Sequence, residues 1–170
     1  HNKLVRREIY SKNNVLPWDG LNMWEDNGLM TRVMYFGGIL SRIENSYYHY
    51  NKENITAMTA GYGERQVAQM IGVAEHLTEF FQSRPDAEEF QKTVMAFQFL
   101  AKINLITNHW KGLCQYHHTF PGAERIMPEL DINAFSLKGK IRFWFVRLHL
   151  AWLFILFYKC ANILLSLKGR

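Results

Sequence analysis

Cysteine is scarce in this chain of 170 residues, which contains only Cys114 and Cys160. Two cysteines so far apart form no disulfide framework, so a reduced, cytoplasmic setting is expected. No signal peptide is visible, because residues 2–7 have no apolar stretch behind them. The sequence also has no phosphate loop, dinucleotide-binding fingerprint or nucleophile elbow, which argues against the enzymes that depend on those motifs.

The composition is that of a folded protein. Hydrophobic residues make up 48% and aromatic residues 15% of the chain, which is enough for one domain with a real core or a small domain with an appendage. The formal net charge of +5 favours anionic partners such as phosphates, nucleic acid or lipid head groups, without choosing among them. The chain opens on His1 rather than on Met, and we expect it to be a piece of a longer protein.

The first part of the chain predicts a mixture of helix and strand. Residues 1–10 are expected to be extended or mixed. A helix is predicted from Glu25 to about Phe36, where apolar residues recur at helical spacing until Gly37-Gly38 ends them. Residues 39–50 have the highest β propensity and predict one or two short strands.

A polar, Gly-containing linker at residues 51–63 separates two parts of different character, 1–62 and 63–170. The second part is almost wholly helical in pattern. Helices are predicted at 64–82 and from about residue 86 to 108, because their apolar residues fall at three- and four-residue spacing. The predicted fold class is therefore α+β and mainly helical.

The segment 139–167 is apolar nearly all round a helical wheel and is flanked by cations. Arg147, His149 and Lys159 make a transmembrane placement costly, so a helix lying at the membrane interface fits better. Packing against its own domain or another subunit remains an alternative, and a homo-oligomer is left open because the helix would form an exposed patch on a monomer. The flanking cations do not line one face between stacking aromatics, which favours lipid over nucleic acid.

Glu25 and Asp26 are the first candidates for chemistry. Acids gather at helix starts because the helix dipole favours negative charge there, which explains the pair without any function. The functional explanation is that one carboxylate is held at the helix N-terminus and faces a cleft as a general base.

Two further groups of residues are candidates for a binding or metal site. Tyr47-Tyr48-His49-Tyr50, followed by Lys52 and Thr56, is suited to stacking a sugar or base and neutralising a phosphate, although an edge strand with half-buried tyrosines explains it too. Cys114 and His117 have a spacing compatible with zinc, but no second ligand pair follows, and no metal site is predicted.

The order of these features resembles the second half of a bacterial glycosyltransferase of family two, with the GT-A type of fold. The resemblance rests on His1-Asn2-Lys3-Leu4-Val5-Arg6-Arg7-Glu8-Ile9-Tyr10, Trp24-Glu25-Asp26 and Ile43-Glu44-Asn45-Ser46-Tyr47-Tyr48-His49-Tyr50, and it covers about residues 1–60. The helical remainder resembles the C-terminal extensions of capsule and lipopolysaccharide transferases more loosely. Residues 1–62 would then be the acceptor-side portion of a GT-A-like α/β domain.

The resemblance implies an inverting transfer from a nucleotide sugar to a saccharide or lipid-linked acceptor in the synthesis of cell-surface polysaccharide. By position, Asp26 is similar to the catalytic base that deprotonates the acceptor hydroxyl, and Glu25 is its partner. His49, Lys52 and Thr56 are implied to lie near the diphosphate or on a mobile active-site loop.

Arg6 or Arg7 is implied to assist with the phosphates, and the family often carries Arg where this chain has Asn51-Lys52. The family's nucleotide-binding half holds Mn²⁺ or Mg²⁺ through an Asp-x-Asp motif, and no Asp-x-Asp occurs in this chain. These residues alone are therefore expected to be inactive, in an enzyme peripheral to the inner face of the cytoplasmic membrane. The alternative is a non-enzymatic helical module that binds a partner or a membrane surface.

Overall fold

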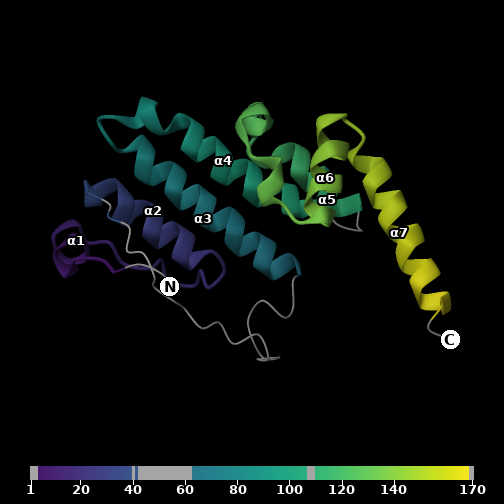
Figure 1. The fold of residues 1–170 in the computed structure, drawn as a ribbon, viewed down its shortest axis with the longest axis horizontal. Helices are drawn as coiled ribbons and strands as arrows, with labels where there is room; N and C mark the ends of the chain where they lie inside the picture. The colour runs from purple at the N-terminus through teal and green to yellow at the C-terminus, as the bar shows by residue number, and fades with distance from the viewer. Residues whose placement is uncertain (1–3, 40, 42–62, 107–109, 169–170) are drawn as a thin grey trace. The chain divides into compact units, whose positions relative to one another are not determined.

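The computed structural model describes residues 4–39, 41, 63–106 and 110–168, the last eight of these as backbone only. Within these ranges every regular element is a helix, so the chain is mainly helical, as predicted. The seven α-helices are shown in Figure 1: α1 (Arg7–Asn13), α2 (Glu25–Gly37), α3 (Glu64–Gln82), α4 (Gln91–Lys102), α5 (Trp110–His118), α6 (Leu137–Arg147) and α7 (Ala151–Lys168). Short 3₁₀ turns lie between them: η2 (Ala87–Phe90), η3 (Ile103–Leu105), η4 (Ala123–Glu129) and η5 (Ile132–Ala134).

The chain divides into two compact units, residues 1–76 and residues 77–170, and the division falls within α3. The division predicted after residue 62 lies at the edge of the stretch that the structure does not describe, and it stays a prediction. The strands predicted at 39–50 also lie outside the described residues, apart from Ile39 and Ser41, which have no regular structure.

Helices α2 and α3 begin and end as the sequence predicts. The acids Glu25 and Asp26 stand in the first turn of α2, and α3 turns one apolar face inward. The buried apolar residues of the N-terminal unit come from the loops and from these helices: Val15, Met23, Val33, Val67, Met70, Val73 and Ala74.

The stretch 1–10, expected to be extended or mixed, is helical from Arg7, where α1 begins. Glu8 in the first turn and Lys12 in the last turn suit the helix dipole, and α1 packs on α2. Asn14 ends the helix in the left-handed region, at φ 50°. Seven residues are too few to be helical alone, so the contact with α2 supplies the stability that the local sequence lacks.

The apolar segment 139–167 is not one continuous helix, which corrects the prediction. It breaks at residues 148–150, where His149 has φ 57° and the amide of Leu150 bonds to the carbonyl of Phe145 at 2.8 Å. The break lets both α6 and α7 bury apolar side chains in one core. That core contains Phe99, Ile103, Ile106, Tyr116, Ala123, Ile126, Met127, Phe143, Val146, Ala151, Phe154 and Ile155.

Among the described residues, no helix combines the length and the apolar character needed to cross a bilayer.

Candidate functional site

The predicted base, Asp26, lies exposed in the first turn of α2, and Glu25 beside it is half-buried. No side chain caps this helix start, and Trp24 before it has φ 67°. The Oδ1 atom of Asp26 accepts hydrogen bonds from the backbone amide of Asn27 at 2.8 Å and from its Nδ2 at 3.3 Å. The carboxylate is thereby oriented by its neighbour while it stays open to solvent.

A buried arginine of α2 links this helix, which carries Asp26, to the loop before it. Arg32 donates from Nε to the carbonyl of Gly28 at 3.1 Å and from Nη2 to the carbonyl of Leu16 at 2.7 Å. Its guanidinium carbon lies 3.8 Å from the centre of the Trp18 ring, and Trp18 stacks on His76 at 5.1 Å. Burial lowers the pKa of Arg32, but an arginine stays charged in proteins.

Gly28 is required by this packing. A Cβ atom at this position would collide with the Trp18 ring and would lie 3.2 Å from Cγ1 of Val73. The residue two positions after Asp26 therefore lets the tryptophan approach the helix backbone, and this contact fixes the turn that presents the carboxylate.

The structure does not bring Arg6 and Arg7 to Asp26 through any contact of the described residues. Both arginines are exposed at the start of α1, and Ile9 in that helix lies close to Gly37. Gly37 is at the opposite end of α2 from Asp26, about 16 Å away along the helix axis. Figure 1 shows α1 beside that far end of α2. The other predicted binding residues, His49, Lys52 and Thr56, lie outside the described residues.

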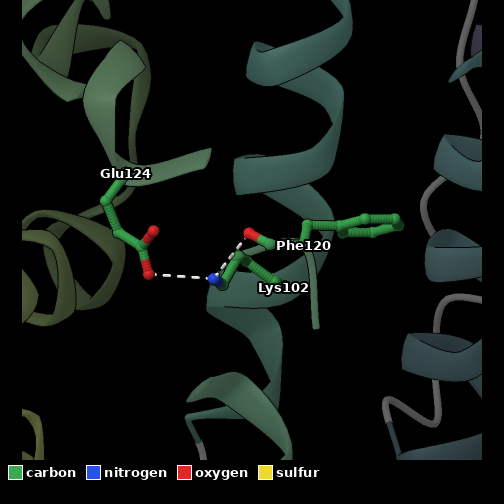
Figure 2. A network of polar contacts seen from close by, with 3 residues as sticks. All are labelled: Lys102, Phe120 and Glu124. Carbon is green, nitrogen blue, oxygen red and sulfur yellow. Dashed lines mark hydrogen bonds and ion pairs between the residues drawn. The ribbon is translucent and has the colours of Figure 1, made fainter. Parts of the chain in front are cut away.

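A second candidate site lies in the C-terminal unit. It is a cluster of polar side chains around a buried lysine that the sequence did not predict. Lys102 is fully buried near the end of α4, and Figure 2 shows its ammonium group between two acceptors. Nζ donates to a carboxylate oxygen of Glu124 at 2.8 Å and to the carbonyl of Phe120 at 3.0 Å. It also lies 4.4 Å from the centre of the Tyr116 ring.

Glu124 and Tyr116 respond to this arrangement in opposite ways. Burial alone would raise the pKa of Glu124, but the hydrogen bond and charge of Lys102, together with hydrogen bonds from its own backbone amide and from Tyr116, outweigh burial and hold the pKa below its ordinary value. Burial, and then the nearby charge of Glu124, raise the pKa of Tyr116 far above its ordinary value. The Tyr116 hydroxyl therefore stays protonated, and it has no hydrogen-bond partner of standard geometry among the described residues.

These two side chains line a pocket of about 580 Å³ between α5, η4 and the turn that joins α6 to α7. The volume is in the range that small-molecule sites occupy. Its accessible lining is mainly apolar, and Glu124 shares it with four basic or titratable side chains: Arg125, Arg147, His117 and His149. A site of this composition can hold an anionic group next to an apolar one.

The sequence pattern did not predict this pocket. Lys102 lies in the helix predicted at about 86–108, between Ala101 and Ile103, which are both buried. The signal that was available is a lysine amid an apolar run, because lysine is almost never fully buried unless it is paired. Its partner, Glu124, is 22 residues away, so only the fold reveals the pair.

Among the described residues, no group of three or more His, Cys, Asp or Glu side chains could hold a metal ion. Cys114 and His117 are both exposed on α5, and the structure gathers no further ligand around them.

Comparison of the chain with protein-family models, with curated proteins and with solved structures found no match.

Proposed function

We propose that this chain is the acceptor-side part of an inverting glycosyltransferase, with Asp26 as the general base. The observation that carries the proposal is the Glu25-Asp26 pair at the start of α2, within the stretch of residues 1–60 that resembles family-two transferases. The exposed carboxylate, on a helix anchored by Arg32 and Trp18, supports this role because a base must be both accessible and held in place.

In this mechanism the carboxylate of Asp26 takes the proton of an acceptor hydroxyl as its oxygen attacks the anomeric carbon of the donor sugar. The new bond joins the acceptor oxygen to that carbon, the bond from the carbon to the diphosphate breaks, and the nucleoside diphosphate leaves. Among the described residues nothing hydrogen-bonds to Oδ2 of Asp26, so this oxygen is available to accept the proton. Glu25 would orient the acceptor.

The proposal extends to the parts that the structure does not describe. Residues 39–50 would supply the strands of a GT-A-like α/β domain, and His49, Lys52 and Thr56 would contact the donor diphosphate, with help from Arg6 or Arg7. An enzyme of this type would use Mn²⁺ or Mg²⁺ to offset the charge of the diphosphate. The described residues do not fit such an ion, so its ligands would come from a donor-binding half.

The test is sugar transfer by a longer protein that contains this chain, measured as release of nucleoside diphosphate from a panel of nucleotide sugars with candidate acceptors. Asp26→Asn is expected to lower turnover by at least about a hundredfold, as is usual for loss of a general base, while donor binding stays unchanged. Asp19→Asn is the matched control, since Asp19 is also exposed and loses the same charge. Turnover that survives in Asp26→Asn would remove the assignment of the base.

A second candidate is a non-enzymatic helical module peripheral to a membrane. It is favoured by large apolar side chains exposed on α6, on α7 and in the turn between them, which suit an interface. The coding sequence upstream of His1 separates the two candidates. A donor-binding segment that ends in an Asp-x-Asp strand is expected for the transferase, and a start codon directly before His1 would favour the module.

A further inference from the structure

Large apolar side chains are exposed along α6, the turn after it and α7, and together they are named the apolar surface: Trp144, Leu148, Trp152, Leu156 and Phe157. Their exposed fractions lie between 40% for Leu156 and 60% for Leu148, although each is a large apolar side chain. Trp152, Leu156 and Phe157 follow one another on a single face of α7, while Phe154 and Ile155 on the opposite face are buried in the core. Helix α7 therefore has two apolar faces, and the core of its own unit covers one of them.

The segment that carries this apolar surface has charges of one sign only. No acidic residue occurs after Asp131 in the sequence. Arg147 and Lys159 are exposed beside the apolar residues, and the guanidinium carbon of Arg147 lies 5.3 Å from the centre of the Trp144 ring. Exposed tryptophan flanked by cations is the composition of a surface that binds an anionic bilayer.

Other cations of this segment have structural tasks. The ammonium group of Lys138 donates to the Tyr158 hydroxyl at 2.8 Å, which ties α6 to α7. Arg142 donates from Nη1 to the carbonyl of Ile103 at 3.0 Å and to Oδ1 of Asn104 at 3.2 Å, which ties α6 to η3. Arg147 and Lys159, beside the apolar surface, are thus different cations from Lys138 and Arg142, which hold the helices together.

The pocket adjoins this apolar surface. Trp152 belongs to the apolar surface and also lines the pocket. Arg147 lines the pocket too, and it contacts Trp144 of the apolar surface. Within the pocket the charge of Glu124 is offset by Lys102 at 2.8 Å. The positive charges of Arg125 and Arg147 have no such compensation, since no ion pair to either arginine is found among the described residues.

We propose that the pocket binds the phosphate head group of an anionic phospholipid while the apolar surface enters the bilayer interface. Arg125 and Arg147 contact the phosphate oxygens, and the acyl chains lie along Trp152 and the outer face of α7. A guanidinium group binds phosphate through two parallel hydrogen bonds, and the apolar side chains replace the water that the lipid would otherwise expose. The proposal does not rest on the transferase activity, because it uses residues of the C-terminal unit only.

The test is flotation of the 170-residue chain with vesicles of phosphatidylcholine, alone or mixed with phosphatidylglycerol. The chain is expected to float with the mixed vesicles and to bind pure phosphatidylcholine at least about tenfold more weakly. Equal binding to both vesicles would overturn the head-group site, and absence of binding to either would overturn the whole proposal.

The variant Arg125→Gln/Arg147→Gln separates the pocket from general charge attraction. It is expected to weaken binding to the mixed vesicles by about tenfold or more, whereas Lys92→Gln/Lys111→Gln removes the same charge outside the pocket and is expected to cost much less. Equal losses in both double variants would overturn the pocket as the binding site. Circular dichroism of each variant checks that the helices are retained.

Free inorganic phosphate is the other source of the same chemistry. Titration calorimetry with phosphate in the absence of vesicles is expected to give no saturable binding over the range in which the mixed vesicles bind. Saturable binding of phosphate that Arg125→Gln/Arg147→Gln abolishes would assign the pocket to the free ion and overturn the lipid assignment.

Discussion

Among the described residues, each of the two units buries one cation, and the two cations are satisfied differently. Arg32 in the N-terminal unit bonds to two backbone carbonyls and stacks on Trp18, and no acid pairs with it among the described residues. Lys102 in the C-terminal unit bonds to one backbone carbonyl and to the carboxylate of Glu124. Both are almost inaccessible to solvent, at 6% and 0% exposure.

The difference follows from the shapes of the two groups. A guanidinium is planar and weakly hydrated, so flat contact with an indole and two in-plane hydrogen bonds can replace its water. An ammonium is a compact, strongly hydrated charge, and it needs an opposite charge to compensate the loss of water. The stability of the C-terminal unit therefore depends on a titrating partner, whereas the buried cation of the N-terminal unit depends on the geometry around α2.

The largest expected effect comes from removing the ammonium group. Lys102→Met leaves Glu124 without its partner and is expected to lower the free energy of unfolding by about 3 kcal/mol, measured by urea denaturation. Lys92→Met is the control, since Lys92 lies on the same helix and pairs with Glu129 at 3.0 Å on the surface. That exposed pair is worth at most about 1 kcal/mol. Equal losses in the two variants would contradict the difference between buried and exposed pairs.

The second prediction tests the role of shape in the N-terminal unit. Arg32→Lys keeps the charge but cannot make both hydrogen bonds and the flat contact with Trp18, so unfolding is expected to be easier by about 2 kcal/mol. Arg65→Lys, an exposed change on α3, is expected to alter stability by less than about 0.5 kcal/mol. If Arg32→Lys left the free energy of unfolding unchanged, a positive charge alone would be enough at this position.

A smaller effect is expected from Gly28→Ala, which forces the Trp18 ring away from α2. Overpacking costs about 1–3 kcal/mol, and the better helix propensity of alanine returns up to about 1 kcal/mol, so the net loss is expected to be about 1 kcal/mol. Gly37→Ala in the same helix is the control, because its Cβ would lie 4.0 Å from the nearest atom, Cδ1 of Ile9. If both variants have the same melting temperature, Trp18 does not constrain the helix.

The smallest effect is a dependence of stability on pH that only the C-terminal pair should show. The folded-state pKa of Glu124 lies below its ordinary value of 4.5, so its contribution is complete above that value and is lost as the pH falls through the lowered pKa. Glu124→Gln is expected to flatten the acid side of the curve of unfolding free energy against pH. Glu89→Gln, on the exposed η2 turn, should leave the curve unchanged. A curve that Glu124→Gln does not flatten would contradict the coupling to Lys102.

The candidate sites differ in how far the sequence anticipated them. Glu25 and Asp26 were predicted at a helix start and are found there, because acids in the first turn and apolar spacing are local signals. The pocket around Tyr116 and Glu124 was not predicted, because its members come from segments with no common pattern. Arg32 was also missed, since a helical wheel cannot show that Trp18 and Leu16 from the preceding loop would cover it.

By itself the sequence determined the helical character of the chain and the bounds of α2 and α3, because three- and four-residue apolar spacing is a local property. The tertiary structure alone decided that residues 7–13 are helical and that the last apolar segment breaks at His149. No proline or glycine marks that break, and the turn is stabilised by the core contacts on either side of it. The partners of the two buried cations were decided in the same way, since a desolvated charge is compensated by whatever groups the fold brings within hydrogen-bond distance.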